Sequence, residues 1–200
     1  MTAEPLILAS QSVARKTMLE RAGVLVETCP AKIDEPALHA ALAAEGAQPR
    51  DIADALAEAK AQKIAWRFPQ ARVLGADQVL VLESQVFEKV HTEGEARAVL
   101  EQLSGKTHML ISAAVIYEAG APVWRTIDQV RMTMRPLSQE FLDDYLAAQM
   151  PGILDSVGCY QLEAAGAQLF DRVSGDYFTV LGLPLLPILG FLRSRGMLLT

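Results

Sequence analysis

The spacing of hydrophobic and polar residues predicts a chain in which helices alternate with strands. An apolar run at residues 6–9 predicts a short buried strand, and residues 72–82 carry the strongest strand pattern in the sequence. Apolar residues recur three and four positions apart after Ser12 and again after Asp51, as they do on one face of a helix. Helices mixed with neighbouring and distant strands favour an α/β sheet protein.

The rest of the chain continues this alternation. The stretch 29–48 is rich in proline and is expected to be irregular, apart from a helical turn or two at residues 38–45. The other expected elements are a strand at residues 24–28, a helix from Thr92 to Leu103 with a capping box, strands at residues 108–117 and 123–134 joined by a hairpin, a helix capped by Ser138, two short strands, and a last helix that begins at Pro184.

Composition and charge narrow the class of protein. The content of 51% hydrophobic and 21% charged residues, without repeats or linkers, predicts one globular domain over residues 1–200. A net charge of −6 argues against a nucleic-acid polymer or an anionic membrane as partner. The two cysteines match no CxxC pattern, and the sequence shows neither a signal peptide nor an apolar stretch that could span a membrane. We therefore expect a soluble cytoplasmic protein.

The first place where polar chemistry gathers is the segment that contains Ser10, Ser12 and Arg15. A strand that ends in hydroxyl residues and leads at once into a helix leaves backbone N–H groups unpaired, and such groups suit a phosphate. Arg15, one turn into the helix, could add a bidentate contact to it. The alternative is that Ser12 is only an N-cap and Arg15 only a solvated helix residue.

The second place is Asp77, which follows Gly75 and Ala76 inside an apolar strand. A carboxylate in such a strand is costly unless its charge is used, and a strand would hold it rigidly as a metal ligand or general base. Gly75 leaves room for the close approach of another backbone or a ligand. The alternative is that Asp77 caps a bend in the chain.

Several charged residues elsewhere fit the same chemistry only as a group. Glu35, Lys60 and Lys89 are each expected to be solvated when considered alone, whereas together they would supply an oxygen ligand for Mg²⁺ and ammonium groups for phosphates. Sequence spacing does not show whether they converge. The histidines have no metal-ligand spacing, and we expect them, His108 included, at the surface or in loops.

Taken in order, these motifs form a recognisable set. They are Ser10-Gln11-Ser12 with Arg15, Ile33-Asp34-Glu35, Ala57-Glu58-Ala59-Lys60-Ala61, Leu74-Gly75-Ala76-Asp77-Gln78-Val79, Lys89, Leu103-Ser104-Gly105-Lys106-Thr107-His108, and Gly175-Asp176 followed by Gly182-Leu183-Pro184-Leu185. From residue 6 to about residue 189 the chain resembles the Maf family of nucleoside triphosphate pyrophosphatases.

This resemblance implies a fold, a reaction and an assembly. The fold is an elongated α/β structure, with a mixed sheet flanked by helices and two lobes around a cleft, similar to inosine triphosphatases. The reaction is the hydrolysis of a nucleoside triphosphate to the monophosphate and pyrophosphate with a divalent cation, Mg²⁺ or Mn²⁺. The family also implies a homodimer. The alternative function is a non-catalytic nucleotide-binding regulator of septum formation and cell division.

The resemblance also assigns site residues by their motifs. Asp77 matches the catalytic carboxylate, which acts as proton acceptor for the attacking water or through the metal, and Glu35 matches a second carboxylate of the metal site. The phosphate-binding positions of the family correspond to Ser10, Ser12, Arg15, Lys60 and Lys89.

The chain departs from the common family pattern where the base is chosen. Ala14 stands where many members have the first of two arginines, so that contact position is empty. Gln78 follows the catalytic aspartate where thymidine- and uridine-selective members have threonine, and Glu163 replaces a later glutamine. Gln78 with Glu163 resembles the branch that prefers 7-methyl-GTP, because a carboxylate can accept hydrogen bonds from guanine N1–H and the exocyclic amine.

Overall fold

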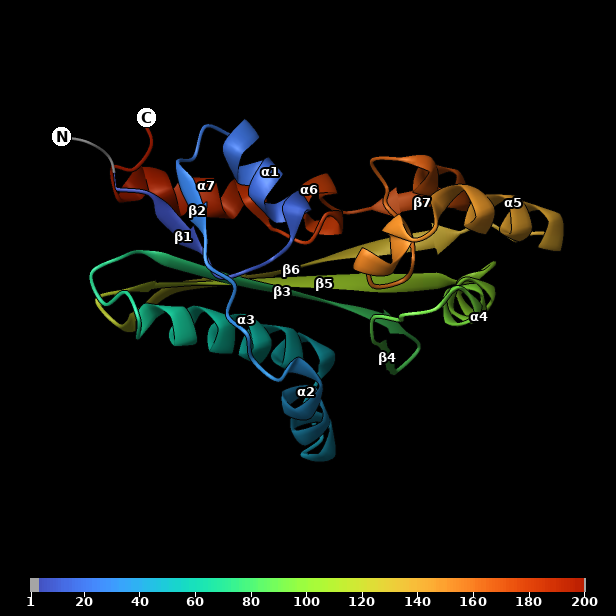
Figure 1. The fold of residues 1–200 in the computed structure, drawn as a ribbon, viewed down its shortest axis with the longest axis horizontal. Helices are drawn as coiled ribbons and strands as arrows, with labels where there is room; N and C mark the ends of the chain where they lie inside the picture. Colours follow the sequence, from blue (N-terminus) through green and yellow to red (C-terminus); the bar gives the residue numbers. More distant parts are fainter. Residues whose placement is uncertain (1–3, 200) are drawn as a thin grey trace. The chain divides into compact units, whose positions relative to one another are not determined.

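The structure is a computed structural model that describes residues 4–199 (Figure 1). None of its helices within these residues has the length and apolar character needed to cross a membrane. In chain order the elements are β1 (Leu6–Leu8), α1 (Val13–Arg21), β2 (Val26–Thr28), α2 (Glu35–Ala44), α3 (Pro49–Ala65), β3 (Val73–Leu82), β4 (Gln85–Phe87), α4 (Glu93–Leu103), β5 (Thr107–Glu118), β6 (Ala121–Met134), α5 (Gln139–Gln149), the 3-10 helices η1 (Gly152–Asp155) and η2 (Ala165–Leu169), β7 (Phe170–Ser174), α6 (Tyr177–Val180) and α7 (Leu185–Ser194).

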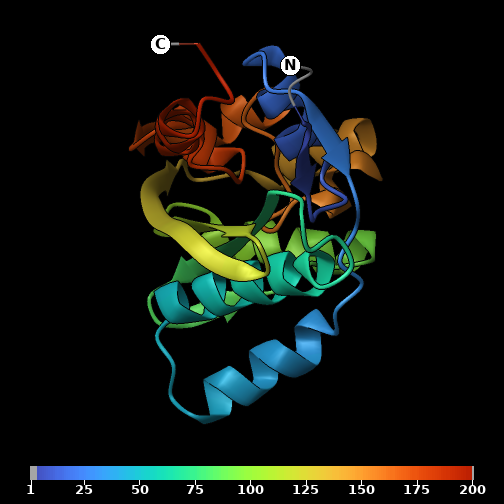
Figure 2. The same ribbon diagram turned by 90° about the vertical axis from the view of Figure 1, so that its left-hand side faces the viewer.

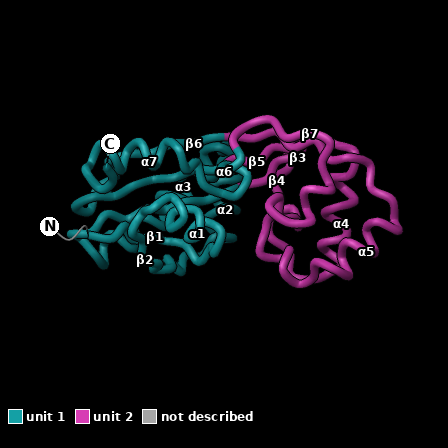
Figure 3. Tube along the Cα trace, turned by 90° about the horizontal axis from the view of Figure 1, so that it is seen from above, with its two compact units in different colours: residues 1–78, 112–128, 177–200 teal, residues 79–111, 129–176 magenta. Residues whose placement is uncertain are grey.

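The chain forms two compact units, which are coloured separately in Figure 3. Unit 1 comprises residues 1–78, 112–128 and 177–200, and unit 2 comprises residues 79–111 and 129–176. Strands β3, β5 and β6 contribute residues to both. The single domain expected over residues 1–200 stays a prediction, and residues 1–3 and 200 lie outside the described part of the chain.

The strands make a mixed sheet, which confirms the α/β class. Its order is β2-β1-β3-β5-β6-β7, and β4 pairs with β3. Strand β1 is parallel to both β2 and β3, whereas the pairs β3–β4 and β6–β7 are antiparallel. The expected hairpin joins β5 to β6 through Ala119 and Gly120, both with positive φ (49° and 76°), as in the two-residue turn whose twist matches that of the strands.

Local signals in the sequence located most helix ends correctly. Ser12 and Ser138 cap α1 and α5 through their hydroxyl oxygens, and Thr92 with Glu95 forms the expected capping box of α4. Three expectations about helices and strands were wrong. Residues 35–44 form a full helix, α2, because the Asp34 carboxylate accepts from the Ala37 N–H at its start.

The other two wrong expectations concern α3 and the strands after α5. Helix α3 begins at Pro49, not at Asp51, since proline at the first helical position needs no N–H partner. Only β7 forms in the described chain between α5 and α6, where we expected two short strands; the 3-10 helices η1 and η2, with turns and irregular chain between them, precede it. The short strand β4 was not expected.

In unit 1, helices cover both faces of the strands. Figures 1 and 2 show α1 and α7 on one face of β1, β3 and β5, with α3 on the opposite face. The face toward α1 and α7 holds one apolar core, whose buried residues are Leu6, Leu8, Met18, Leu19, Val24, Leu74, Ala76, Ala114, Ile116, Leu183, Leu185, Ile188 and Leu192. Leu74 and Ala76 are two residues apart on β3, so the intervening Gly75 and the following Asp77 point to the α3 face.

Gly75 determines how closely α3 packs on β3. A Cβ atom placed on Gly75 would lie 2.1 Å from the Ala57 carbonyl oxygen and 2.6 Å from the Ala61 nitrogen, and backbone atoms cannot yield to it. The absent side chain therefore allows the helix backbone to contact the strand backbone directly. This contact determines which α3 side chain lies opposite Asp77.

Unit 2 contains a buried histidine, which corrects the expectation of a surface position for His108. This residue is 1% exposed, and its Nε2 lies 2.7 Å from the hydroxyl of the buried Tyr160. Its Nδ1 is buried without a hydrogen-bond partner in the described part of the chain. Burial lowers the pKa of His108 to about 4, because the imidazolium form cannot be hydrated there.

The buried His108 predicts a loss of stability in acid. The unfolded chain binds a proton at about pH 6.5 and the folded chain only at about 4, so stability present at neutral pH falls across that interval. The contribution to the free energy of unfolding is about 3 kcal/mol between about pH 7 and about pH 4. Urea titrations at several pH values give the free energy of unfolding of the wild type and of His108→Gln. Between about pH 7 and about pH 4 the wild type should lose about 3 kcal/mol more than the variant, and equal losses in the two proteins would contradict this.

Candidate active site

The centre of the candidate site is an ion pair between β3 and α3. Lys60 lies on α3 three residues after Ala57, and its Nζ donates a 2.6 Å hydrogen bond to Asp77 Oδ1. Asp77 is 6% exposed and Lys60 7% exposed. The close packing of α3 over Gly75 thus brings a buried carboxylate and a buried ammonium together. Burial of both charges makes this pair different from a surface salt bridge, which contributes little.

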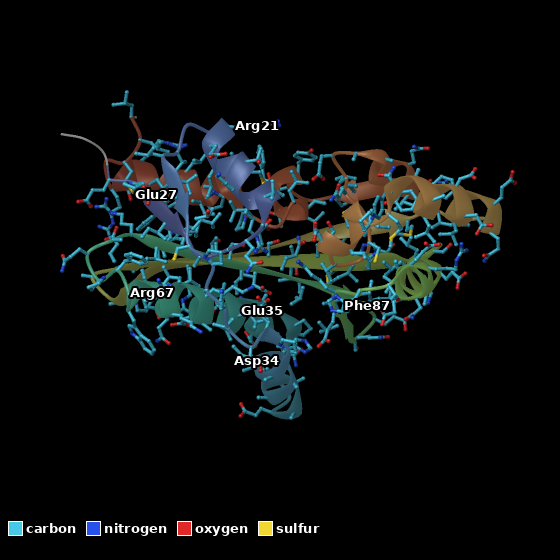
Figure 4. All side chains as sticks on the ribbon, in the orientation of Figure 1. Arg21, Glu27, Asp34, Glu35, Arg67 and Phe87 are labelled. Atoms are coloured by element: carbon cyan, nitrogen blue, oxygen red, sulfur yellow. The ribbon has the colours of Figure 1, made fainter. Side chains whose placement is uncertain are left out.

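A second carboxylate joins this pair from α2. Glu35 is the first residue of α2 (Figure 4), and its Oε2 accepts a 2.8 Å hydrogen bond from Lys60 Nζ. The Glu35 side chain is 51% exposed, so one side of the cluster is open to solvent. Glu35, Lys60 and Asp77 therefore lie together in the structure, which their spacing in the sequence could not show.

The environment of Asp77 acts on its charge in two opposing ways. Burial raises the pKa of the Asp77 carboxyl above its ordinary value, and the nearby Lys60 and Arg15 cations lower it without cancelling the rise. A carboxylate with a raised pKa is a stronger proton acceptor than one in water, provided that it is deprotonated when it acts. Lys60 and Arg15 favour the charged carboxylate of Asp77, against the effect of burial.

The start of α1 supplies backbone N–H groups near the same strand. Ser12 Oγ accepts from the Arg15 N–H at 3.3 Å, and Ser10 Oγ accepts from the Ser12 N–H at 3.2 Å. These hydroxyl groups use two of the amides at the strand–helix junction. In the described part of the chain, the amides of Val13 and Ala14 at the start of the helix have no hydrogen-bond partner, as is usual for the first turn, and such amides can bind an anion or water.

Arg15 is far more engaged with the protein than a solvated helix residue would be. It is 9% exposed; its Nε donates to the Gly182 carbonyl at 2.8 Å, and its Nη1 donates to the Ala76 carbonyl at 2.9 Å and to Ser10 Oγ at 3.2 Å. Burial lowers the pKa of the Arg15 guanidinium, while Asp77 and Glu35 oppose the shift. Three of its five N–H donors are thus used inside unit 1, and within residues 4–199 no hydrogen bond of Nη2 is found.

Gln78, the residue after Asp77, also binds the protein through its nitrogen. Its Nε2 lies 3.0 Å from Ser112 Oγ, 2.9 Å from the Thr179 carbonyl and 3.1 Å from the Val180 carbonyl. Sequence reasoning did not single out Ser112 or Thr179. The available signal was weak: Ser112 is a hydroxyl residue within the apolar strand pattern of β5.

The two remaining candidates, Lys89 and Glu163, belong to unit 2. Lys89 is exposed in the segment between β4 and α4, and Glu163 is exposed in a turn that precedes η2. Their contact with substrate stays a prediction, as does the substrate-binding role of Ser10, Ser12, Arg15, Lys60 and Gln78.

The donor set of unit 1 fits one kind of metal site. The described residues contain no cluster of three or more histidine, cysteine, aspartate or glutamate side chains that could hold a metal ion by themselves. Glu35 and Asp77 do converge on one cationic atom, Lys60 Nζ. Two carboxylates that converge in this way suit Mg²⁺, which proteins bind through one or two carboxylates together with substrate phosphates and water.

The fold and the site thus define an α/β protein with a partly buried, charged site near the start of α1. Residues 5–195 match the family model described as Maf-like protein. The chain belongs to the Maf family, as the motifs had indicated.

Several curated relatives match over nearly their full length. A protein from Jannaschia sp. (strain CCS1) named nucleoside triphosphate pyrophosphatase 1 is 50% identical over 96% of this chain and 97% of its own. A nucleoside triphosphate pyrophosphatase from Caulobacter vibrioides is 48% identical over 99% of both chains. A relative from Rhizobium etli, 46% identical over 96% of both chains, is named 7-methyl-GTP pyrophosphatase.

Among solved structures, the chain is similar to a nucleoside-triphosphatase and dITP/XTP pyrophosphatase from Mycobacterium abscessus. The two share 13% identity over 97% of this chain and 96% of the other, with a TM-score of 0.43. A likeness at this level identifies neither a ligand nor an activity.

Proposed function

We propose that this chain hydrolyses a nucleoside triphosphate to the monophosphate and pyrophosphate. The observation that carries the proposal is the buried pair of Asp77 and Lys60 beside the start of α1, in a chain of the Maf family whose relatives carry that activity in their names. A protein that only sensed a nucleotide would have no need of a buried carboxylate placed to take a proton.

Asp77 is the proton acceptor in this proposal. Water that attacks a phosphorus atom must lose a proton as the new bond forms, and a carboxylate within hydrogen-bond reach can take it. The raised pKa of Asp77 makes it a better base than a solvated aspartate. Lys60 holds Oδ1 from α3, so the other carboxylate oxygen, Oδ2, is the one that we assign to the water.

The triphosphate brings about four negative charges to a protein whose own net charge is −6, so local cations must offset both. We assign the first amides of α1, the Nη2 of Arg15, and the ammonium groups of Lys60 and Lys89 to the phosphates. Ser10 and Ser12 shape the turn that presents the amides, since their hydroxyls bind its backbone and Arg15.

We further assign Glu35 and Asp77 to a divalent cation, Mg²⁺ or Mn²⁺, held jointly with the phosphates. A cation bound there would neutralise phosphate charge and polarise the phosphorus that is attacked. In the structure Lys60 Nζ donates to both carboxylates, so in this proposal Asp77 and Glu35 would each contact both Lys60 and the metal. A cytoplasmic homodimer remains part of the proposal.

For the base, we infer a preference for 7-methyl-GTP over dTTP and UTP. Gln78 and Glu163 support this choice, as does the name of the Rhizobium etli relative. The carboxylate of Glu163 can accept from the guanine N1–H and amine, which thymine and uracil lack in that arrangement.

A panel of triphosphates tests both parts of the proposal. The purified chain is incubated with 7-methyl-GTP, GTP, dTTP and UTP in Mg²⁺ or Mn²⁺, and the products are separated by ion-exchange chromatography. Monophosphate with pyrophosphate supports cleavage at the α-phosphorus, whereas diphosphate with orthophosphate excludes it. Faster turnover of dTTP than of 7-methyl-GTP would overturn the base assignment. Nucleotide binding without any turnover would instead favour a regulator of cell division.

A further inference from the structure

A buried hydrogen bond in unit 2 joins the start of β5 to the segment that leads to Glu163. His108 Nε2 lies 2.7 Å from the hydroxyl of Tyr160, and these residues are 1% and 4% exposed. The ring of Phe170, the first residue of β7, lies near both, with centroid distances of 5.9 Å to His108 and 4.8 Å to Tyr160. A hydrogen bond enclosed in this way is costly to break, because neither polar group would find water, so it holds the two segments together.

The backbone just before Tyr160 has an unusual conformation. Gly158 and Cys159 both have positive φ, 88° and 58°. A Cβ on Gly158 would lie 2.6 Å from Leu80 Cδ1, so the chain passes close to β3 at this point. Cys159 is not a glycine, and a left-handed conformation at such a residue persists only where its surroundings fix it. The hydroxyl of Tyr145 on α5, which donates to the Cys159 carbonyl at 3.3 Å, is one of these fixing contacts.

The turn that follows Tyr160 carries Glu163 at the surface. Tyr160 is buried, whereas Glu163, three residues later, is exposed. The Ala164 N–H donates to the Gln161 carbonyl at 3.1 Å and closes the turn. A Cβ on Gly166 would lie 2.5 Å from the Gln161 carbonyl oxygen, so the start of the turn packs directly on the backbone of η2. The direction in which Glu163 projects therefore depends on where Tyr160 is held.

We propose that His108 is a positioning residue for selection of the base, because its hydrogen bond with Tyr160 determines where the Glu163 carboxylate lies. The inference rests on the proposed function, in which Glu163 accepts from guanine. Among residues 4–199 the Glu163 side chain has no hydrogen bond or ion pair, so the backbone of its turn determines its direction. A binding group must be held within about 0.5 Å of its productive position by the residues that support it. His108 and Tyr160 give that support from inside unit 2, without contact with the base.

Tyr160→Phe removes the hydroxyl and keeps the ring beside Phe170. We expect the ratio of kcat/KM for 7-methyl-GTP to kcat/KM for dTTP to fall about 5–10-fold, because a hydrogen bond to a charged group is weakened for guanine alone. The fall should come from KM for 7-methyl-GTP, with kcat within about twofold, since the reacting atoms are not displaced. Tyr117→Phe is the matched control: Tyr117 is buried in unit 1, its hydroxyl donates to Glu58 at 3.0 Å, and its loss should leave the ratio unchanged.

Glu163→Gln shows whether the effect passes through Glu163. In this background Tyr160→Phe should change the ratio by less than about twofold, because no carboxylate remains to be positioned. Equal falls in the two backgrounds would overturn the proposal. A lower Tm with an unchanged ratio would also overturn it, because the hydrogen bond would then only stabilise the fold.

Two variants of His108 decide the matter if Tyr160→Phe does not fold. His108→Leu offers the Tyr160 hydroxyl no polar partner and should lose the preference for 7-methyl-GTP. His108→Gln can still form a hydrogen bond with that hydroxyl and should retain the preference. Equal ratios in the two variants would overturn the proposal.

Failure of the proposed function is visible separately. If the wild-type chain hydrolyses no triphosphate of the panel, or prefers dTTP, the proposed function fails before any variant is compared. The support of the Glu163 turn is then judged from hydrogen exchange, followed by mass spectrometry of peptides that contain residues 158–164. These amides should exchange about 10-fold faster in Tyr160→Phe than in the wild type and in Tyr117→Phe, since local opening becomes easier, and equal rates would overturn the positioning role.

Discussion

Replacing Asp77 by asparagine is expected to lower kcat for pyrophosphate release by about 10²–10⁴-fold, the usual contribution of a general base. Asparagine has the size of aspartate, but its amide cannot take a proton from water near neutral pH. Its oxygen can still accept from Lys60 Nζ, so the contact between α3 and β3 is kept. The loss should therefore be in turnover and not in folding.

Steady-state kinetics and thermal unfolding together check this expectation. Asp51→Asn makes the same chemical change at an exposed position in the first turn of α3, the helix that carries Lys60, and should retain wild-type turnover. If Asp77→Asn kept kcat within about tenfold of the wild type, Asp77 would not be the proton acceptor. A fall in kcat matched by a fall in Tm below the assay temperature would count against a chemical role too.

The parts of the molecule that the sequence predicted well are those specified by neighbouring residues. Ser12 and the pair Thr92 and Glu95 bind backbone groups within one helical turn, so their roles follow from spacing of three residues. Asp77 was identifiable because a carboxylate is costly in an apolar strand. These signals require no knowledge of the rest of the fold.

What could not be predicted depends on contacts between distant segments. Lys60 reaches Asp77 because Gly75 allows α3 to pack directly on β3. Glu35 joins this pair because the first residue of α2 lies within hydrogen-bond distance of Lys60 on α3. His108 shows the same limit in unit 2, since nothing near it in the sequence indicates that its ring is buried against Tyr160. Periodicity determines which face of an element is apolar, but not which polar side chain lies opposite.

The contact between Lys60 and Asp77 makes a second large effect expected, this time on stability. Lys60→Met keeps the apolar length of the side chain but leaves Asp77 buried without its ammonium partner, which should lower the free energy of unfolding by about 3–5 kcal/mol. The same change in an Asp77→Asn background should cost less, because a neutral amide does not need a counter-ion. The coupling between the two positions should be about 1–3 kcal/mol.

Urea titrations of the wild type, both single variants and the double variant measure this coupling directly. Lys63→Met provides the control, since Lys63 is exposed one turn along α3 and, among the described residues, donates only to the Lys32 carbonyl; we expect a change within about 0.5 kcal/mol. Equal costs of Lys60→Met in the two backgrounds would mean that Lys60 stabilises the chain through packing or through Glu35 and not through Asp77. Coupling of the expected size would make Lys60 the residue that allows a carboxylate to be both buried and charged, the condition under which Asp77 can act as a base.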